Sequence, residues 1–297
     1  MKVQTVTKFQ TVTNVVGYVK GLASPDRYII VGSHHHTVYS YNGQEWASST
    51  AIITAFIQAL MLRVKRGWRP DRTIVFCAWG GTTLGNIGSY EWGEDFKKIL
   101  QKNVVAYVSL HSPVRGNSSL HPVASPSLQQ LVVELSGEMI LQIANEPVLP
   151  FNALDIALEV QNSLKGDRLS AHHLLAAASC LRESAELFQS EEMRPANDPK
   201  ERAPIRVRML NDILQDMEKS FLVRQVPPGF YRNILYHMDE KTSQFSILVE
   251  AWEHCNSLAS NETLQGALSE VLNSINSAQV YFKVGLEVFE SFLVAKT

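Results

Sequence analysis

The chain has 297 residues, of which 45% are hydrophobic and 19% charged, with 16 Gly and 12 Pro. At roughly 150 residues per domain this length indicates one large or two ordinary domains, and the composition excludes collagen-like, low-complexity and wholly disordered proteins. The 27 Lys and Arg residues nearly balance the 29 Asp and Glu residues, for a net charge of −2. Because the chain offers little to attract a phosphate backbone, we expect a globular protein that does not bind nucleic acid.

Other sequence features leave the cellular compartment open. The longest apolar stretch, Ala51–Leu62, contains Thr54 and Gln58 and is shorter than the roughly 18 residues that a membrane-spanning helix needs. The first ten residues alternate polar and apolar side chains, unlike a secretory signal. The three cysteines are widely spaced, so neither a disulfide framework nor a structural zinc site is predicted.

Up to about residue 125, short β-prone runs alternate with longer amphipathic stretches, which is typical of an α/β fold. The expected strands are Val3–Phe9 and Thr11–Val19, which form a hairpin, then Tyr28–Ser33, Arg72–Trp79 and Val104–Leu110. The expected helices are Ala47–Val64 and Ile87–Leu100. Lys97 and Lys98 stand near the end of the second helix, where the helix dipole favours cations.

After Ser125 the pattern changes to helical spacing throughout, which predicts an all-α bundle. The motif ANEPVLP, residues 144–150, interrupts that spacing. We therefore expect two domains, 1–145 and 146–297. The expected helices are Ser127–Leu141, Ala153–Leu164, Leu169–Gln189, Ile205–Phe221 and Leu264–Leu293.

Ligands bind at the carboxyl ends of parallel strands, so the loops after residues 33, 79 and 110 are the candidate sites. In an extended chain alternate residues share a face, so His34 and His36 of the first loop could reach one metal ion. The alternative is a polar loop with one buried, hydrogen-bonded histidine, and imidazole serves either purpose. We favour the polar loop.

The other two loops offer less chemistry. The second, Trp79–Gly85, has no ionisable group, and we expect Thr82 and Thr83 to cap the following helix. A threonine hydroxyl cannot take a proton from water near neutral pH without an adjacent base. The third loop offers His111 and Arg115, and a single histidine at a strand end is more often structural than catalytic.

Several segments resemble a known family. PDRYIIVGSHHH, GWRPDRTIVFCAWGGTTLGNIGSYEW and VVAYVSLHSPVRGNSSL are similar to the peptidase domain shared by glutamate carboxypeptidase and the transferrin receptor. NEPVLPFNALDIA, RMLNDILQDMEKSF and PPGFYRNILYHMDEK are similar to the helical dimerisation domain of those proteins. The resemblance covers most of the chain. It implies a truncated zinc-aminopeptidase-like sheet with flanking helices, followed by an all-α transferrin-receptor-like dimerisation bundle that forms a homodimer.

The resemblance also places the family's metal site on this sequence. The first zinc-binding histidine corresponds to His34, and the aspartate that bridges two zinc ions corresponds to Glu45, or to Gln44 if a one-residue insertion lies elsewhere. The paired glutamates, one the general base and one a zinc ligand, correspond to Thr82 and Thr83. A further aspartate ligand corresponds to His111. The resemblance therefore implies an inactive branch of the family, with no catalytic residue, bound metal or other cofactor, and with His34, Glu45 and His111 as vestigial positions.

A section of the family's peptidase domain is missing. After the helix at Ser127–Gly137 the family continues through further sheet, the substrate pocket and a last zinc-binding histidine, whereas this chain passes near Met139 directly into dimerisation-type helices. The family's membrane anchor and protease-associated insert are not found upstream, so we expect a spliced isoform or fragment. Relatives are type II membrane proteins with an extracellular peptidase part, and the location of this chain stays open. The shortened sheet should expose an edge strand, which favours aggregation.

Three hypotheses about function follow. The leading one is a catalytically inactive relative that acts through protein association. The alternative is a residual single-zinc metallopeptidase that uses His34, His36, Glu45 and His111, because three protein ligands and a water make a workable catalytic zinc site. The third is a receptor-like module that binds an unidentified protein, by analogy of fold alone.

Dimerisation would depend on the last predicted helix. Its apolar residues form a stripe that could face a second copy of the chain, or could pack within its own bundle. The stripe consists of Leu268, Val271, Leu272, Ile275 and Val280.

Overall fold

The computed structural model divides into two compact units. One comprises residues 1–122 with 134–146, here called the sheet unit, and the other comprises residues 123–133 with 147–297, here called the helical unit. The single domain boundary between residues 145 and 146 stays a prediction. The structure describes residues 11–34, 43–82, 85–110, 114–115, 119–120, 125, 128, 136–165, 172–193, 196, 198, 203–223, 233–235, 245, 247–249, 251–252 and 261–294.

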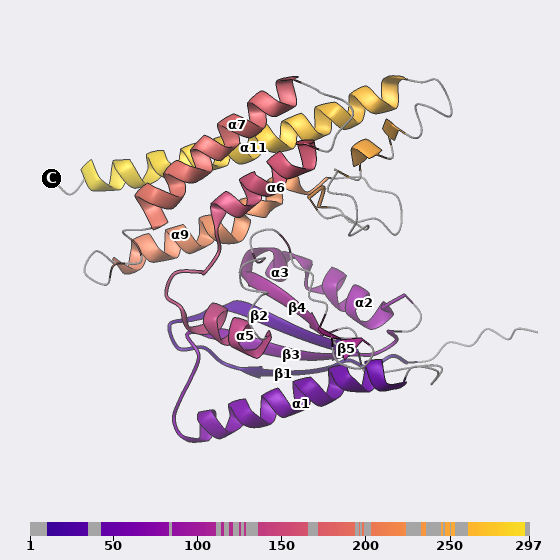
Figure 1. Cartoon of the computed structure of the whole chain (residues 1–297). Helices are drawn as coiled ribbons and strands as arrows, with labels where there is room; N and C mark the ends of the chain where they lie inside the picture. Colours follow the sequence, from indigo (N-terminus) through magenta and orange to yellow (C-terminus); the bar gives the residue numbers. More distant parts are fainter. Residues whose placement is uncertain are drawn as a thin grey trace, which may run out of the picture. The chain divides into compact units, whose positions relative to one another are not determined.

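The sheet unit is built on a mixed four-stranded sheet in the order β1-β3-β2-β4 (Figure 1). Strand β2 is parallel to both β3 and β4, and β1 is antiparallel to β3. The three predicted parallel strands, Tyr28–Ser33, Arg72–Trp79 and Val104–Leu110, are confirmed as β2, β3 and β4. The central strands β2 and β3 are buried over most of their length, and such strands read as unbroken apolar runs. The strands are β1 (Val15–Val19), β2 (Ser24–His34), β3 (Arg72–Trp79) and β4 (Val104–Leu110), and the short β5 (Val114–Arg115) and β6 (Ser119–Leu120) pair with each other.

Strand β1 lies at one edge of the described sheet. It pairs with β3, with Val15 opposite Ala78 and Val19 opposite Ile74. The hairpin predicted between this segment and Val3–Phe9 involves residues outside the described part of the chain. The side chains of Val15 and Tyr18 are 61% and 72% exposed, so β1 is an apolar edge strand.

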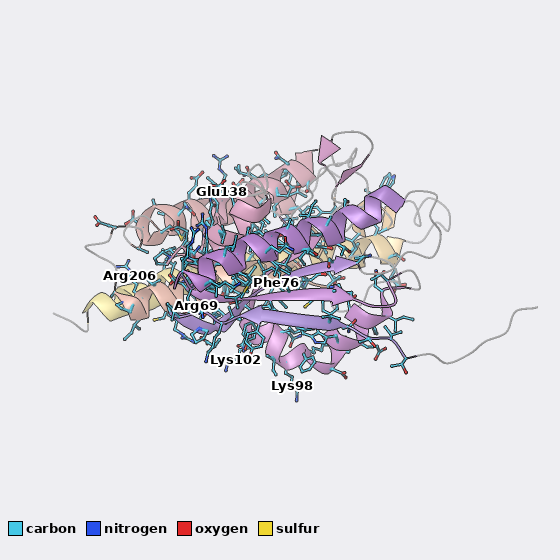
Figure 2. All side chains as sticks on the ribbon, turned by 90° about the horizontal axis from the view of Figure 1, so that it is seen from below. Arg69, Phe76, Lys98, Lys102, Glu138 and Arg206 are labelled. Carbon is cyan, nitrogen blue, oxygen red and sulfur yellow. The ribbon has the colours of Figure 1, made fainter. Side chains whose placement is uncertain are left out.

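Helices cover both faces of the sheet. Helix α1 (Gly43–Lys65) lies on one face, and α2 (Ile87–Asp95) and α3 (Lys97–Asn103) lie on the other (Figure 1, Figure 2). Phe56 of α1 packs edge to face on Phe76 of β3, with ring centroids 6.0 Å apart. On the opposite face the core includes Ile30, Cys77 and Trp79, with Trp92 of α2 packed against it.

The single helix predicted over residues 87–100 is wrong, because the helix divides at Phe96. The backbone of Phe96 has φ −102° and ψ 10°, outside the α-helical region. Its ring packs on Trp92 with centroids 5.2 Å apart. Lys97 is therefore the first residue of α3 rather than a residue near a helix end, and its Nζ lies 3.6 Å from a carboxylate oxygen of Glu94.

The C-terminal end of helix α5 (Ser136–Asn145) is hydrogen-bonded to the buried side chain of Arg72. The helix extends four residues past the predicted end at Leu141, and part of the predicted helix, residues 129–135, lies outside the described residues. Arg72 of β3 is 4% exposed. Its Nη1 donates to the carbonyls of Ile143 and Glu146, each at 2.7 Å, and so satisfies carbonyl groups that the helix end leaves unpaired. Loss of hydration on burial lowers the pKa of Arg72 to about 10.

The helical unit packs its helices around apolar side chains, as predicted. Helix α7 lies beside both α6 and α11 (Figure 1). None of the helices in the described part of the chain is both long and apolar enough to cross a membrane. The elements are α6 (Ala153–Lys165), α7 (His172–Leu187), the π-helix η3 (Phe188–Met193), α9 (Pro204–Asp216), the 3₁₀ helix η4 (Met217–Phe221) and α11 (Asn261–Val294).

The apolar stripe predicted on α11 divides between two sides of the helix. Val271 and Ile275 are fully buried within the unit, as are Ala278 and Phe282 further along the same face. Phe282 packs on Phe188 of η3, with centroids 5.4 Å apart. Val280, by contrast, is 57% exposed, because five residues after Ile275 the helix has turned by roughly 140° beyond a full turn. The buried part of the stripe therefore packs within its own unit.

Candidate functional site

The parallel strands bring three of the candidate segments to one edge of the sheet. In the pairing register His34, the last residue of β2, lies opposite Trp79, the last residue of β3. Ser33 lies opposite Leu110, the last residue of β4. Carboxyl ends of neighbouring parallel strands are where α/β folds bind ligands, so the chosen loops start at the expected place.

Of the metal-site positions implied by the resemblance, the structure describes the side chains of His34 and Thr82. His34 is half-buried, and its carbonyl accepts a hydrogen bond from Thr50 Oγ1 of α1 at 3.2 Å. Glu45 lies in the first turn of α1, but its side chain is outside the described residues. His36, Thr83 and His111 also lie outside them.

The described residues of the loop after β3 include two with left-handed backbone, and the residue that caps the following helix is Asn86 rather than a threonine. Thr82 is 7% exposed. Helix α2 begins at Ile87, and its N-cap is Asn86, whose φ of 55° is left-handed and whose side chain makes no capping hydrogen bond. The predicted capping role of Thr82 and Thr83 is therefore wrong, since the helix starts four residues after Thr83. Gly81 and Gly85, with φ of 63° and 81°, let the chain turn where most residues would be strained.

Asn14, just before β1, holds this loop in place. The backbone N–H of Gly80 donates to Asn14 Oδ1 at 3.0 Å, and Asn14 Nδ2 donates to the carbonyl of Gly88 at 2.7 Å. A Cβ added at Gly80 would collide with the Thr13 carbonyl, and one added at Gly88 would collide with Asn14 and with the Gly80 carbonyl. One amide thus joins the start of the loop to the first turn of α2.

Sequence reasoning missed Asn14, and it missed a contact near the same edge between the buried Trp79 and the partly exposed Tyr107. Trp79 Nε1 donates to the Tyr107 hydroxyl at 3.0 Å, and burial raises the pKa of Tyr107. This contact passes over Gly32, because a Cβ there would collide with both side chains. A glycine inside the buried run YIIVGS is the sequence signal that could have pointed to such a close approach.

The described side chains do not fit a zinc centre. No group of three or more His, Cys, Asp or Glu side chains that could hold a metal ion occurs in the described part of the chain. His34 is the one predicted metal-site position there with a nitrogen or carboxylate donor, and zinc sites use three or four protein ligands. Cys77, the cysteine of β3, is fully buried, and loss of hydration raises the pKa of its thiol to about 12, so it is not poised as a thiolate ligand.

Comparison with protein families gives two matches in chain order. Residues 14–151 match peptidase family M28, and residues 169–283 match the transferrin receptor-like dimerisation domain. The chain therefore combines a region similar to peptidase family M28, here called the M28 region, with a region similar to the transferrin receptor-like dimerisation domain, here called the dimerisation region. The M28 region contains the four-stranded sheet and its helices, and the dimerisation region contains α7, α9 and most of α11.

The relatives divide by how much of the chain they match. A human protein named inactive N-acetylated-alpha-linked acidic dipeptidase-like protein 2 is 67% identical over the whole chain, which spans 47% of its length. A Caenorhabditis briggsae protein named glutamate carboxypeptidase 2 homolog is 38% identical over 43% of the chain and 16% of its own length. Mouse aminopeptidase NAALADL1 is 33% identical over 44% of the chain and 18% of its own length.

The alignment with the human protein also bears on the missing section. It covers 377 positions, and this chain has 297 residues, a difference of 80. At least that many positions therefore hold human residues opposite a gap in this chain. The place of the gap, predicted near Met139, stays a prediction.

Proposed function

We propose that this chain does not hydrolyse peptides and acts through association with other protein surfaces. The observation that carries the proposal is the loop after β3. By the resemblance, a peptidase of this type would place its paired glutamates at Thr82 and Thr83. The loop Trp79–Gly85 has no ionisable side chain, Thr82 is buried, and Asn14 holds the start of the loop.

Threonines in place of the paired glutamates should greatly lower the rate of zinc-dependent hydrolysis. Zinc hydrolysis needs a base that takes a proton from the metal-bound water, and such assistance contributes a factor of roughly 10²–10⁴ in rate. A threonine hydroxyl cannot act as that base near neutral pH, and it is a poor substitute for a carboxylate ligand. The name of the human relative, which describes it as inactive, supports the same conclusion.

Hydrolysis of acidic dipeptides tests the proposal. The purified chain is loaded with zinc and compared with a metal-stripped sample and with His34→Ala. We expect the three samples to hydrolyse the dipeptides equally slowly, at the rate of the buffer. Zinc-dependent turnover that His34→Ala abolishes would refute the proposal and favour the single-zinc alternative. Zinc bound at one equivalent and retained on dialysis would favour that alternative as well.

The association that we propose is a homodimer formed through the helical unit. The match of residues 169–283 to a dimerisation domain supports it. Val271 and Ile275 are buried within the helical unit. Val280 and Val284, on the other side of α11, are 57% and 49% exposed. Four residues apart, these two valines are neighbours on one helical face. Among the side chains of α11 that the structure describes, they are the large apolar ones that are exposed.

Sedimentation of the double variant Val280→Glu, Val284→Glu tests this interface. We expect the parent chain to sediment as a dimer at tens of micromolar and the variant as a monomer, because each carboxylate would lose hydration in the interface. Tyr90→Glu is the matched control, since Tyr90 is 63% exposed but lies in α2, outside the dimerisation region. A monomeric parent chain would exclude the homodimer, and a dimeric double variant would place the interface elsewhere.

A further inference from the structure

The outward side of α1 is uncharged for most of its length and then ends in cations. Residues 46–62 contain no Asp, Glu, Lys or Arg. Near the end of this stretch Leu62 is 59% exposed. Helical positions put Leu62 almost opposite the buried Leu60 and Ile53, at the centre of the outward side. Four exposed cations follow within seven residues: Arg63, Lys65, Arg66 and Arg69.

In the described part of the chain, these cations form no ion pairs with neighbouring carboxylates. Among the residues that the structure describes, no carboxylate lies within ion-pair distance of Arg63, Lys65 or Arg66. Arg69 donates to the carbonyls of Val64 and Trp68, at 3.4 and 3.3 Å, and these are uncharged partners. Residues 63–72 hold five cations and one acid, a net charge of +4.

The charge of the two units differs in sign. The sheet unit has 13 Lys and Arg against 9 Asp and Glu, a net of +4, and the helical unit has 14 against 20, a net of −6. The excess positive charge of the sheet unit therefore equals the charge of residues 63–72. A balanced chain thus carries one concentrated basic segment, and such a segment beside apolar residues is typical of contact with an anionic surface.

A second exposed apolar side chain lies beside this segment. Leu22, in the turn between β1 and β2, is 70% exposed. Its backbone N–H donates to the carbonyl of Pro70 at 2.9 Å, which holds the turn against the residue after Arg69. We call Leu22, Leu62, Arg63, Lys65, Arg66 and Arg69 the basic-apolar patch. Figure 2 shows Arg69 near the end of α1, with Lys98 and Lys102 of α3 on the opposite side of the sheet.

We propose that the basic-apolar patch binds the surface of an anionic lipid bilayer. Each Lys or Arg near such a surface strengthens binding about fivefold, through attraction to the acidic headgroups. The exposed leucines add a second contribution, because apolar side chains at the edge of a basic helix enter the boundary between headgroups and acyl chains. A soluble acidic protein would engage the cations, but it offers no general reason for exposed leucines beside them. The observations therefore favour a lipid surface.

Co-sedimentation of the full chain with lipid vesicles tests the proposal. One set of vesicles is phosphatidylcholine alone, and the other contains about one third phosphatidylserine. We expect binding to the anionic vesicles alone, and at least a tenfold weaker partition for the triple variant Arg63→Gln, Lys65→Gln, Arg66→Gln. The matched control is Lys97→Gln, Lys98→Gln, Lys102→Gln, which removes the same charge from exposed positions of α3. Leu62→Ser should weaken binding severalfold.

The outcomes are separable. No binding to the anionic vesicles overturns the proposal, and so does an equal loss of binding in the two triple variants, since net charge alone would then explain it. Binding that Leu62→Ser leaves unchanged and that soluble poly-glutamate abolishes assigns the patch to an acidic macromolecule and also overturns it. The substituted side chains are exposed, so each variant should unfold at the temperature of the parent chain, which thermal unfolding by circular dichroism checks.

Discussion

Asn14 offers the sharpest test of how the loop after β3 is held. Asn14→Ala removes the acceptor for the Gly80 N–H and the donor to the Gly88 carbonyl. A partly buried group that loses its partner costs about 1–3 kcal/mol, and an ordinary hydrogen bond contributes about 0.5–1.5 kcal/mol. We therefore expect Asn14→Ala to lower the unfolding free energy of the sheet unit by about 2–4 kcal/mol.

Asn14→Asp separates the two hydrogen bonds. A carboxylate still accepts from the Gly80 N–H, but it cannot donate to the Gly88 carbonyl. Near pH 7 we expect Asn14→Asp to lower the unfolding free energy by about half as much as Asn14→Ala does. At low pH we expect a smaller loss, because a protonated aspartate regains a donor.

Urea unfolding followed by tryptophan fluorescence measures these losses. Four of the five tryptophans, Trp46, Trp68, Trp79 and Trp92, belong to the sheet unit. A loss below about 0.5 kcal/mol for Asn14→Ala would refute the argument, because the loop would then be held without this amide. Equal losses for the two variants would show that the bond to Gly88 alone matters.

Three further predictions test other contacts. Tyr107→Phe removes the acceptor of the Trp79 N–H and should cost about 1–2 kcal/mol in urea; an unchanged midpoint would show that water replaces the hydroxyl. Asn211 accepts a hydrogen bond from the Leu149 N–H and donates one to the Pro147 carbonyl, each at 2.8 Å. Asn211→Ala should therefore lower the free energy of unfolding by about 1–3 kcal/mol, measured by far-ultraviolet circular dichroism. A loss seen in the fluorescence signal alone would contradict this prediction. Burial raises the pKa of Asp155 above its ordinary value, so the folded chain holds this proton to higher pH than the unfolded chain, and stability from this group falls as pH rises above about 4. Asp155→Asn should therefore gain in melting temperature over the parent chain as pH increases from 3 to 7, and a pH-independent difference would refute the cause.

The spacing of apolar residues predicted the sheet edge where the candidate loops begin. It predicted less well the hydrogen bonds that hold those loops. The strand ends at Trp79 and Leu110 were placed correctly, and the first strand end was placed one residue early, at Ser33 instead of His34, because each follows an apolar run. Hydrogen-bonded partners far apart in the sequence were not predicted. Asn14 and Gly80 are separated by 66 residues, and nothing in the local sequence joins them. The helix cap was misplaced for a related reason, since left-handed backbone at Gly81, Gly85 and Asn86 delays α2.

By itself the sequence determined the three parallel strands and the approximate positions of the main helices, because the spacing of apolar residues reflects which side of an element is buried. It also determined that no ionisable group occupies the loop after β3. Only the tertiary structure decided the strand order, the break at Phe96 where its ring packs on Trp92, and the exposure of Val280 while Ile275 is buried. Each of these depends on which surface an element meets, and a helix or strand acquires its inner side only when another element packs against it.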